Sequence, residues 1–368
     1  MTKAAELAKM GEVLDNSQIG RKNIIINGAM QCSQRSTSAT GVGGTNDVYP
    51  TLDRFAVVVS STAGRCTMSQ STVTDLEGFS NALKLDVTTA DTSIAAGEYF
   101  IIQHKIEGFN IQQLKATSTS TRAFTISFYA KSNESRAFNL EARFTNGTNK
   151  QAVKTFTTGT SWARYTMTVP AASSTQIDND NSNEMQLNFW LHAGSTYSGG
   201  TPSTTLGASS NTARAAGVGS IFASTDNTLE ITGIQLEVGS QATPFEHRSF
   251  AEELTLCQRY LYNIPPLSVQ YVLHGWSHDS DTMITIKDFP TTMRATPSLE
   301  VGDATLLSIY TSGAGTTNRA VSSMALNGMG PSGGGINVNS AANQTAGFSG
   351  GVYNNVSSPT YIRFDAEM

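Results

Sequence analysis

Charged residues are scarce in this chain of 368 residues, because Asp, Glu, Lys and Arg together make up only 14% of it. Globular proteins typically contain roughly 25%. The 24 basic residues are outnumbered by 29 acidic ones, so the net charge is −5. A weakly acidic chain lacks the basic footprint that nucleic-acid binding requires. We therefore expect no nucleic-acid partner.

Cysteine is almost absent, with three residues at Cys32, Cys66 and Cys257. They are too few and too scattered for a disulfide framework or a zinc site. A single Cys32–Cys66 bridge is compatible with the sequence, but buried free thiols are the favoured interpretation.

Long apolar runs are also missing. No stretch approaches the ~20 apolar residues of a membrane span, so we expect no membrane insertion. The first twenty residues carry acidic side chains within their apolar pattern and lack the continuous apolar core of a signal peptide. We expect the protein to stay in the cytoplasm of the cell that makes it, or to leave by a route other than secretion.

Catalytic and metal-binding patterns are lacking as well. The five histidines form no HExxH motif, and no GxSxG motif occurs. The acidic run Asp178–Glu184 has alternating oxygen ligands but lacks the glycine and glutamate of an EF-hand loop, which favours a solvated turn. The glycine-rich run Gly328–Gly335 lacks the strand and helix context of a phosphate loop. We predict no enzymatic activity, no catalytic residues, no metal site and no required cofactor.

Uncharged polar residues and short alternating segments are abundant instead. About nine strand-like segments lie between Asn23 and Phe245. They begin with Asn23–Gly28 and include Tyr99–Gly108, Phe138–Asn146 and Met185–Gly194. A period of two, with turn residues between segments, predicts a mainly β fold with an antiparallel jelly roll or β-sandwich.

An N-terminal segment departs from this pattern. Residues 3–16 place Leu7, Met10 and Leu14 at coiled-coil spacing. A helix of this length is marginal in isolation. We expect it to pack against a partner, its own domain or copies of itself, as an attachment or oligomerisation helix.

A second helix is predicted after the first set of strands. One helical stripe is formed by residues spaced at i, i+4, i+7 and i+11, namely Phe250, Leu254, Cys257 and Leu261. Ser249 is the predicted N-cap, and Glu252 completes a capping box. We expect the stripe to pack between domains or subunits.

Four parts follow from these signals. They are the N-terminal helix (1–22), the jelly roll (23–246), the connecting helix (247–266) and a second, smaller β-domain (267–368). The segment Ser195–Ser220, which is poor in bulky apolar residues, is predicted to be a long surface loop of the jelly roll.

Aromatic residues at exposed turns are the remaining candidates for function, because an aromatic ring beside polar groups suits a sugar surface. The candidates for glycan contact are Trp276, His278, Asp279, Asp281 and Tyr197. Trp162 and Trp190 lie on alternating strands and are predicted to be core residues.

Several segments resemble motifs that recur in tail-fibre and related virion proteins of tailed bacteriophages. Ile231–Leu261 matches the pattern QLE-G--ATPFE-RS---EL--CQRY. Asn23–Ser38 and Tyr49–Phe55 are similar to the opening motifs of these proteins, and Phe289–Val301 resembles the start of their C-terminal module.

The resemblance implies a carbohydrate-binding-like jelly roll followed by a helix and a phage-specific β-domain. It also implies a homotrimeric tail fibre, made in the host cytoplasm and located in the virion tail. Its N-terminus would dock on other virion proteins, and its surface would contact host polysaccharide. A structural calcium is common in the carbohydrate-binding relatives, but its ligands are unassigned in this sequence.

Two other classes of function stay open. One is a structural tail adaptor, head fibre or capsid-decorating protein without glycan recognition. The other is a polysaccharide depolymerase, which is less favoured because solenoid repeats and a convincing carboxylate pair are absent.

Overall fold

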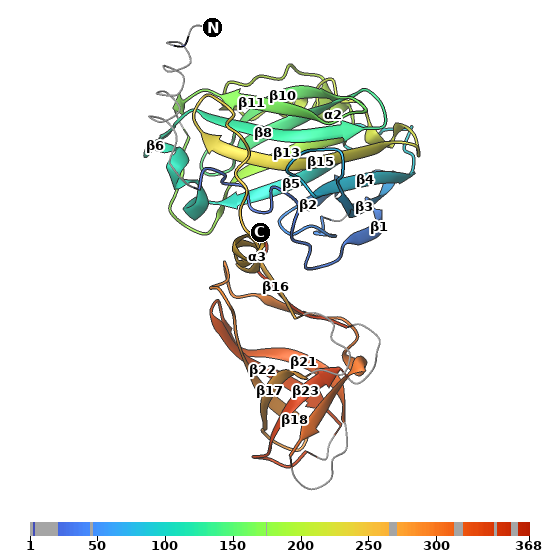
Figure 1. Ribbon diagram of the computed structural model, residues 1–368, viewed down its shortest axis with the longest axis vertical. Helices are drawn as coiled ribbons and strands as arrows, with labels where there is room; N and C mark the ends of the chain where they lie inside the picture. The colour runs from blue at the N-terminus through green and yellow to red at the C-terminus, as the bar shows by residue number, and fades with distance from the viewer. Residues whose placement is uncertain are drawn as a thin grey trace. The chain divides into compact units, whose positions relative to one another are not determined.

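The computed structural model describes residues 3, 21–44, 47–173, 175–264, 271–312, 319–341, 344–354 and 360–368. The expected N-terminal helix, with Leu7, Met10 and Leu14, lies outside these residues and stays a prediction. Two compact units are present, a larger one that extends to Glu253 and includes Met368, and a smaller one from Leu254 to Glu367. Figure 1 shows the strands of both.

The larger unit is an antiparallel β-sandwich, which confirms the mainly β fold class (Figure 1). The strands of its first sheet are, in spatial order, β1 (Ser38–Val42), β3 (Arg65–Thr72), β4 (Asn81–Thr89), β15 (Thr228–Val238), β8 (Phe124–Ser132) and β11 (Ala163–Val169). Those of the second are β14 (Gly207–Ala208), β10 (Lys150–Thr158), β9 (Arg136–Phe144), β13 (Asn183–Ala193), β5 (Tyr99–Glu107) and β2 (Ala56–Ser60). A small third sheet contains β6 (Lys115–Thr117), β7 (Ser120–Thr121) and β12 (Ala172–Ser173).

Alternating side chains from the two large sheets form the core of the larger unit. Aromatic rings dominate it, with edge-to-face contacts such as Phe128 against Phe156 and Phe189 at centroid distances of 4.9 and 5.1 Å. Full burial of each such ring contributes about 1.5–3 kcal/mol. The short helical elements η1 (Gly108–Leu114), α2 (Ser195–Ser198), η2 (Asn211–Ala213) and η3 (Ile221–Ala223) lie in the connections between strands.

The predicted first strand is not a strand. Asn23–Gly28 is irregular, and its three consecutive isoleucines are all buried, which the two-sided geometry of a surface strand does not allow. Asn27 has a left-handed φ of 61° that bends the chain. Several strands were not predicted, and the two longest of them, β3 and β10, have sequences rich in polar residues.

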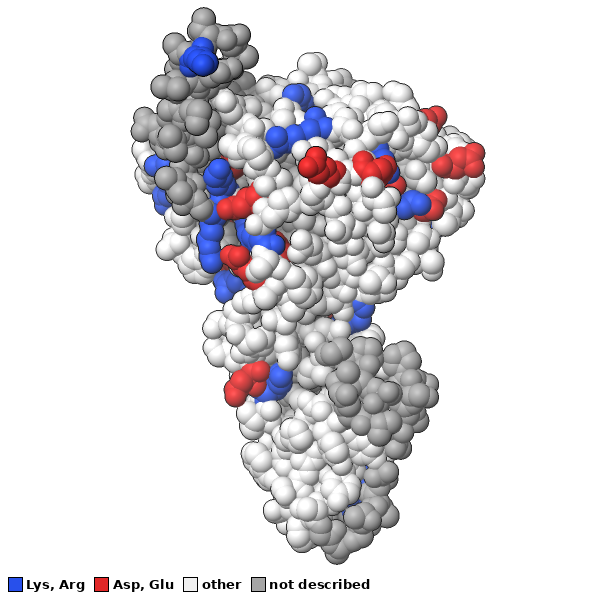
Figure 2. Space-filling view, in the orientation of Figure 1, with Lys and Arg blue, Asp and Glu red and all other residues white. Residues whose placement is uncertain are grey.

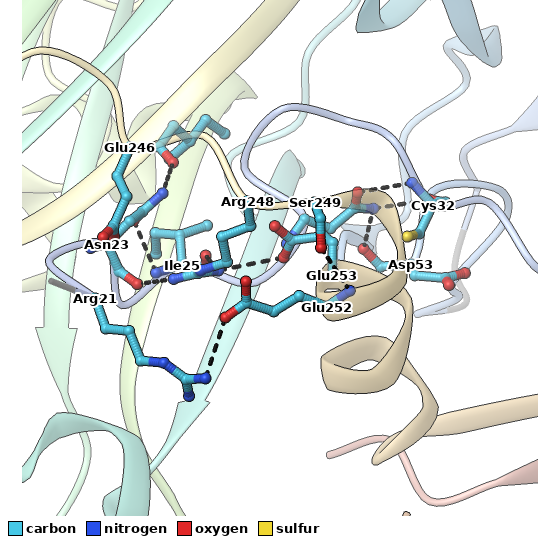
Figure 3. A network of polar contacts seen from close by, with 12 residues as sticks. Arg21, Asn23, Ile25, Cys32, Asp53, Glu246, Arg248, Ser249, Glu252 and Glu253 are labelled. Atoms are coloured by element: carbon cyan, nitrogen blue, oxygen red, sulfur yellow. Dashed lines mark hydrogen bonds and ion pairs between the residues drawn. The ribbon is translucent and has the colours of Figure 1, made fainter. Parts of the chain in front are cut away.

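Motif residues just before and within α3 (Phe250–Gln258) hold the segment around Asn23 in place (Figure 3). The Asn23 backbone N–H donates to Glu246 at 2.7 Å. Arg248 donates to the carbonyls of Asn23 and Ile25. Glu253 accepts from the backbone N–H of Asn27 at 2.5 Å and from Arg248 at 3.3 Å. This recurring motif therefore works as a structural joint within the larger unit.

The connecting helix is shorter than predicted. It begins after Ser249, whose hydroxyl accepts from the backbone N–H of Glu252 at 3.3 Å, as expected of the N-cap. It ends at Gln258, and Leu261 begins a strand instead. Of the stripe, Phe250 is 57% exposed, Leu254 is half-buried, and Cys257 and Leu261 are buried.

Strand pairing in the smaller unit explains where the helix stops. The sequence from Leu261 forms β16 (Leu261–Ile264), which pairs with β24 (Ile362–Asp365), and β24 also pairs with β19 (Ser298–Val301). The closed barrel has the order β17 (Tyr271–Ser277), β18 (Thr282–Asp288), β22 (Gly333–Ser340), β21 (Arg319–Gly330), β20 (Leu307–Thr311) and β23 (Ser349–Asn354). The turn η4 (Ala304–Leu306) precedes β20. Long-range pairing thus outweighs the local helical period at Leu261.

All three cysteines are free and buried, which confirms the thiol interpretation. Burial, assisted by the nearby Asp86 carboxylate, raises the pKa of Cys66 to about 12. None of the helices in the described part of the chain has the length and apolar character that a membrane crossing requires. Figure 2 shows that most of the visible surface is uncharged, in line with the composition.

Glu253 and Glu252 offer a matched test of the joint. The E253Q variant removes the charge that Arg248 and the Asn27 N–H contact in a buried setting, so we expect a loss of about 2 kcal/mol in unfolding free energy. E252Q removes a carboxylate that faces only the 80% exposed Arg21 side chain at 3.2 Å, and should cost less than about 0.5 kcal/mol. Urea unfolding followed by circular dichroism measures both. Equal losses would contradict the assigned role of Glu253.

Candidate functional site

The outer face of the second sheet is polar because its strands alternate. On β13, Leu187 and Phe189 point into the core, whereas Gln186, Asn188 and Trp190 point to the outer face. The same period of two directs the odd-numbered residues of β5 and β9 to this outer face. The residues concerned are Tyr99, Ile101, Gln103, Lys105, Asn139, Glu141 and Arg143.

Strand register arranges these side chains in rows across the sheet. Asn188 lies opposite Gln103 on β5 and Glu141 on β9. Gln186 lies opposite Lys105 and Arg143 in the next row. Opposing side chains in such pairs lie within contact distance. The polar groups of three strands therefore gather in one place.

A groove of about 320 Å³ opens over these rows. Besides residues of the sheet it involves the segment before β2 and the long connection after β13. Its lining consists of Asp47, Val58, Tyr99, Ile101, Gln103, Lys105, Arg143, Gln186, Trp190, Tyr197, Asn211 and Arg214.

Three aromatic rings form one end of the groove. The Trp190 ring lies 5.7 Å from Tyr99 and 5.2 Å from Tyr197, and the two tyrosine rings meet edge-to-face at 5.3 Å. Trp190 is fully buried, whereas both tyrosines are partly exposed. The helical turn α2 presents Tyr197. The tyrosines are thus the rings available to a ligand, and Trp190 supports them.

A buried carboxylate organises the floor. Glu141 accepts from Asn188 at 2.9 Å and from the Trp190 indole at 2.8 Å. It also accepts two hydrogen bonds from Arg214, at 2.9 and 3.1 Å. Asn188 in turn accepts from Gln103 at 2.8 Å. With four donors around it, the Glu141 side chain, which is 0% exposed, is fully satisfied.

The two arginines of the groove differ in their partners. Arg214 is paired with Glu141 and lies over the Trp190 ring, with its guanidinium carbon 4.5 Å from the centroid. Within the described residues, the guanidinium of Arg143 has no hydrogen bond or ion pair, and its buried Nε is unsatisfied. Burial and the charge of Arg214 lower the pKa of Arg143, and the Glu141 carboxylate opposes this effect. Arg143 therefore presents a positive charge that no ion pair engages among the described residues.

The five predicted contact residues are divided between the two units. Tyr197 lies in the groove of the larger unit. The other four belong to the smaller unit, where Trp276 is 42% exposed on β17. His278, Asp279 and Asp281 are exposed on the following turn, where Asp279 accepts from the backbone N–H groups of Asp281 and Thr282 at 3.0 and 2.8 Å. These bonds lower the pKa of Asp279 and give it a turn-forming role.

A second, wider depression of about 430 Å³ lies in the smaller unit. Tyr271, which is 51% exposed, stacks near His274 and meets Tyr310 at a centroid distance of 6.2 Å. A Cβ atom at Gly350 would lie 2.1 Å from the Tyr310 carbonyl oxygen, so glycine is required there. Trp276 is not among the residues that line this depression.

Most residues of the groove were not predicted from the sequence as contact residues. Trp190 is buried as predicted, but its supporting role depends on contacts across strands that no local pattern reports. Trp162 was predicted to be in the core and is half-buried instead, because its indole donates to Asp75 at 2.9 Å and Lys131 lies over its ring. The alternation of apolar and polar residues along β5 and β9 was the sequence signal that could have placed Gln103 and Arg143 on the outer face.

The acidic run Asp178–Glu184 forms a turn whose carboxylates accept hydrogen bonds, as the sequence favoured. Asp178 and Glu184 both accept from the Asn146 side-chain amide, at 2.9 and 3.0 Å. Asp180 accepts from the backbone N–H of Ser182 at 2.9 Å. The carboxylates thus orient their own loop.

No protein-family model matches the chain, and no curated protein matches it either. Among solved structures, one similar protein is the enzymatically active domain of tailspike protein 4 from bacteriophage CBA120. The alignment covers 59% of this chain and 21% of the tailspike chain, with 13% sequence identity and a TM-score of 0.31. The family 11 carbohydrate-binding module of a Clostridium thermocellum cellulase covers 55% of this chain and 97% of its own length, at 11% identity and a TM-score of 0.27. A family 61 carbohydrate-binding module solved with β-1,4-galactotriose aligns over 60% of this chain and 100% of its own length, with 8% sequence identity and a TM-score of 0.29. Likeness at this level carries no inference about function.

Replacing each groove arginine by glutamine separates their roles in stability. R214Q leaves the Glu141 carboxylate buried and uncompensated, so we expect a loss of about 3 kcal/mol in unfolding free energy. R143Q removes a charge that has no partner and should cost less than about 1 kcal/mol. Thermal and urea unfolding of both variants measure the difference. A stability loss from R143Q as large as that from R214Q would show that Arg143 has a structural partner.

Proposed function

We propose that the chain is a glycan-binding protein that acts without catalysis, and that the groove on the second sheet is its binding site. The observation that carries this proposal is the combination of two partly exposed tyrosine rings with a hydrogen-bonded floor in one groove. Sugars present apolar ring faces and many hydroxyls. Tyr99 and Tyr197 suit the ring faces, and the side-chain amides of Gln103, Gln186 and Asn211 suit the hydroxyls, since an amide both donates and accepts.

The charge of the groove favours an acidic glycan. Arg214 forms an ion pair with Glu141, but the guanidinium of Arg143 forms neither an ion pair nor a hydrogen bond among the described residues. A guanidinium can bind a carboxylate or sulfate through two parallel hydrogen bonds. The rest of the chain is net acidic, so this local positive charge is a specific feature of the groove. We therefore propose a ligand that carries carboxylate or sulfate groups.

The carboxylates of the groove support binding without catalysis. Glycoside hydrolysis uses a pair of carboxyl groups placed on either side of the scissile bond. Of the two groove carboxylates, Glu141 is fully buried and bonded to four donors. Asp47 is exposed at the edge and accepts from the Val59 backbone N–H at 3.1 Å. A buried carboxylate engaged by an arginine is poorly suited to protonate or attack a substrate.

The finer assignment rests on the sequence motifs. We propose that the protein is a homotrimeric tail fibre of a bacteriophage virion that contacts host polysaccharide through this groove. Support comes from the motif around Ile231–Leu261, whose residues form the joint of the larger unit. The second candidate is a structural tail adaptor, head fibre or decorating protein, in which the same joint would serve a fold without a sugar ligand.

Binding to a panel of neutral and acidic polysaccharides tests the groove. We expect the intact chain to prefer acidic polymers, with an affinity that falls as salt is added. Y197A should weaken binding about tenfold, as loss of an aromatic anchor does. R143Q should weaken binding to acidic polymers about tenfold and leave binding to neutral ones unchanged. Affinity electrophoresis and isothermal titration calorimetry measure these changes.

Two variants in the smaller unit serve as matched controls. W276A and Y271A remove exposed aromatic rings from the other candidate surface, and we expect glycan binding to persist in both. Loss of binding in either control, with normal binding by Y197A, would move the site to the smaller unit. Absence of binding to any polysaccharide would favour the structural candidate.

Mass and adsorption measurements test the virion assignment. One chain has a mass of 39.1 kDa, and light scattering of the full-length protein should give three times this value. The purified trimer should compete with phage for adsorption to host cells. A monomeric mass contradicts the trimer, and unchanged phage adsorption in the presence of excess protein contradicts the fibre.

A further inference from the structure

Three buried titratable side chains meet away from the groove, near the edge where β4, β5 and β13 end or begin. Asp91 follows β4, Glu98 precedes β5, and His192 lies near the end of β13. They are 4%, 8% and 0% exposed. One ligand atom from each lies within 4.8 Å of the other two. Burying such groups together is costly unless they have partners.

A β-bulge brings His192 into this cluster. Trp190 pairs with Ile101 and His192 pairs with Phe100, so Leu191 is an extra residue in β13. His192 therefore lies opposite Phe100, whose ring is in the core, and contacts Phe222 at a centroid distance of 5.4 Å. Glu98 lies two residues before Phe100, so in extended backbone its side chain points to the same side of the sheet. Bulges commonly redirect a side chain next to a functional site.

The two atoms that face each other across the cluster have no partners. His192 Nε2 and Glu98 Oε2 are buried and lack a hydrogen-bond partner among the described residues. They lie 3.7 Å apart, which is too long for a hydrogen bond. Leaving a buried polar group unpaired costs about 1–3 kcal/mol. Both atoms therefore point at a position that suits a further ligand.

Hydrogen bonds hold the side chains of Asp91 and His192 in place. Asp91 Oδ2 accepts from the Thr62 hydroxyl at 2.7 Å and from the Ala63 backbone N–H at 2.8 Å, and Asp91 Oδ1 accepts from the Ser93 backbone N–H at 3.3 Å. His192 Nδ1 lies 2.7 Å from the Ser220 hydroxyl oxygen. When Nδ1 carries the proton and donates to Ser220, the lone pair of Nε2 faces the cluster. Oriented ligands of this kind are typical of metal sites.

We propose that Asp91, Glu98 and His192 bind a divalent transition-metal ion, with Zn²⁺ as the best match. Zinc lies about 2.0–2.2 Å from nitrogen and oxygen ligands, so two ligands at a tetrahedral angle are about 3.4 Å apart. The observed 3.7 Å between Nε2 and Oε2 is close to this value. Calcium and magnesium prefer oxygen ligands, which disfavours them beside an imidazole. Three protein ligands leave a fourth position open.

The alternative, a charged ion pair between His192 and Glu98, agrees less well with the surroundings. At 3.7 Å, the His192 Nε2 and Glu98 Oε2 atoms are too far apart for the charge-assisted hydrogen bond that stabilises a buried ion pair. A neutral imidazole is the form that binds a metal. A bound Zn²⁺ ion supplies the positive charge that two buried carboxylates require.

The site would also stabilise one end of the groove. The Glu98 carbonyl accepts from the Gly194 backbone N–H at 2.8 Å, and the Ala96 carbonyl accepts from Thr196 at 3.0 Å. These bonds join the loop before Tyr99 to the turn that carries Tyr197. A metal bound beside Glu98 would therefore hold both tyrosines in position. The metal site itself stands whether or not the groove binds glycans.

Zinc titration of the chelator-treated full chain tests the proposal. We expect one Zn²⁺ per chain by calorimetry and elemental analysis, and a rise in melting temperature on binding. Ca²⁺ and Mg²⁺ should cause no comparable rise. E98Q and H192Q should each weaken zinc binding by at least about a hundredfold. Co²⁺ in place of Zn²⁺ should give a visible spectrum that shows an imidazole ligand and is lost in H192Q.

A double variant of the surface histidines provides the control. H274Q with H278Q removes exposed imidazoles that bind metals adventitiously, and its zinc affinity should equal that of the parent chain. E98Q replaces an oxygen that has no hydrogen-bond partner by an amide group of the same size, so its metal-free form should fold normally. The proposal is overturned if the parent takes up no zinc, if E98Q and H192Q bind as the parent does, or if Ca²⁺ replaces Zn²⁺ in the stability assay.

Discussion

The antiparallel pairing of β13 between β5 and β9 is the constraint on which the larger unit depends. Side chains along each strand alternate between the core and the outer face, and the pairing decides which outer residues meet. It places Asn188 between Gln103 and Glu141, and so assembles a connected polar floor from three strands. A one-residue slip of β13 would send Asn188 into the aromatic core. Fold and groove are therefore specified by the same set of contacts.

Electrostatics within the groove follows from one buried charge. Glu141 requires compensation because a carboxylate without water is unstable in a protein interior, and Arg214 supplies it while lying over the Trp190 ring. This ion pair engages Arg214, one of the two neighbouring arginines in the groove. Arg143 is left without a partner, and its exposure to ligand is a consequence of how Glu141 is satisfied. The fold and the proposed ligand preference thus depend on different arginines.

The sequence predicted the strands well and the site poorly, for a physical reason. Alternation within Tyr99–Gly108 and Met185–Gly194 is local, so both strands were foreseen. Their register joins residues more than 80 positions apart, as with Gln103 and Asn188, and no local pattern encodes it. Tyr197 was foreseen as an exposed ring, but Tyr99 and Arg143 were not. Likewise, Leu261 continues a helical stripe in sequence, yet pairing with β24 makes it a strand residue.

The bulge at Leu191 shows how one strand supports two sites. Up to Trp190, the even-numbered residues of β13 face the groove. One extra residue shifts the register against β5, so that His192 faces the buried carboxylates instead. Because Trp190 and His192 are two residues apart on a rigid strand, and Glu98 directly precedes Tyr99, displacement of the buried cluster also displaces the aromatic end of the groove. The proposed metal site and the proposed binding groove therefore share β13 and the start of β5.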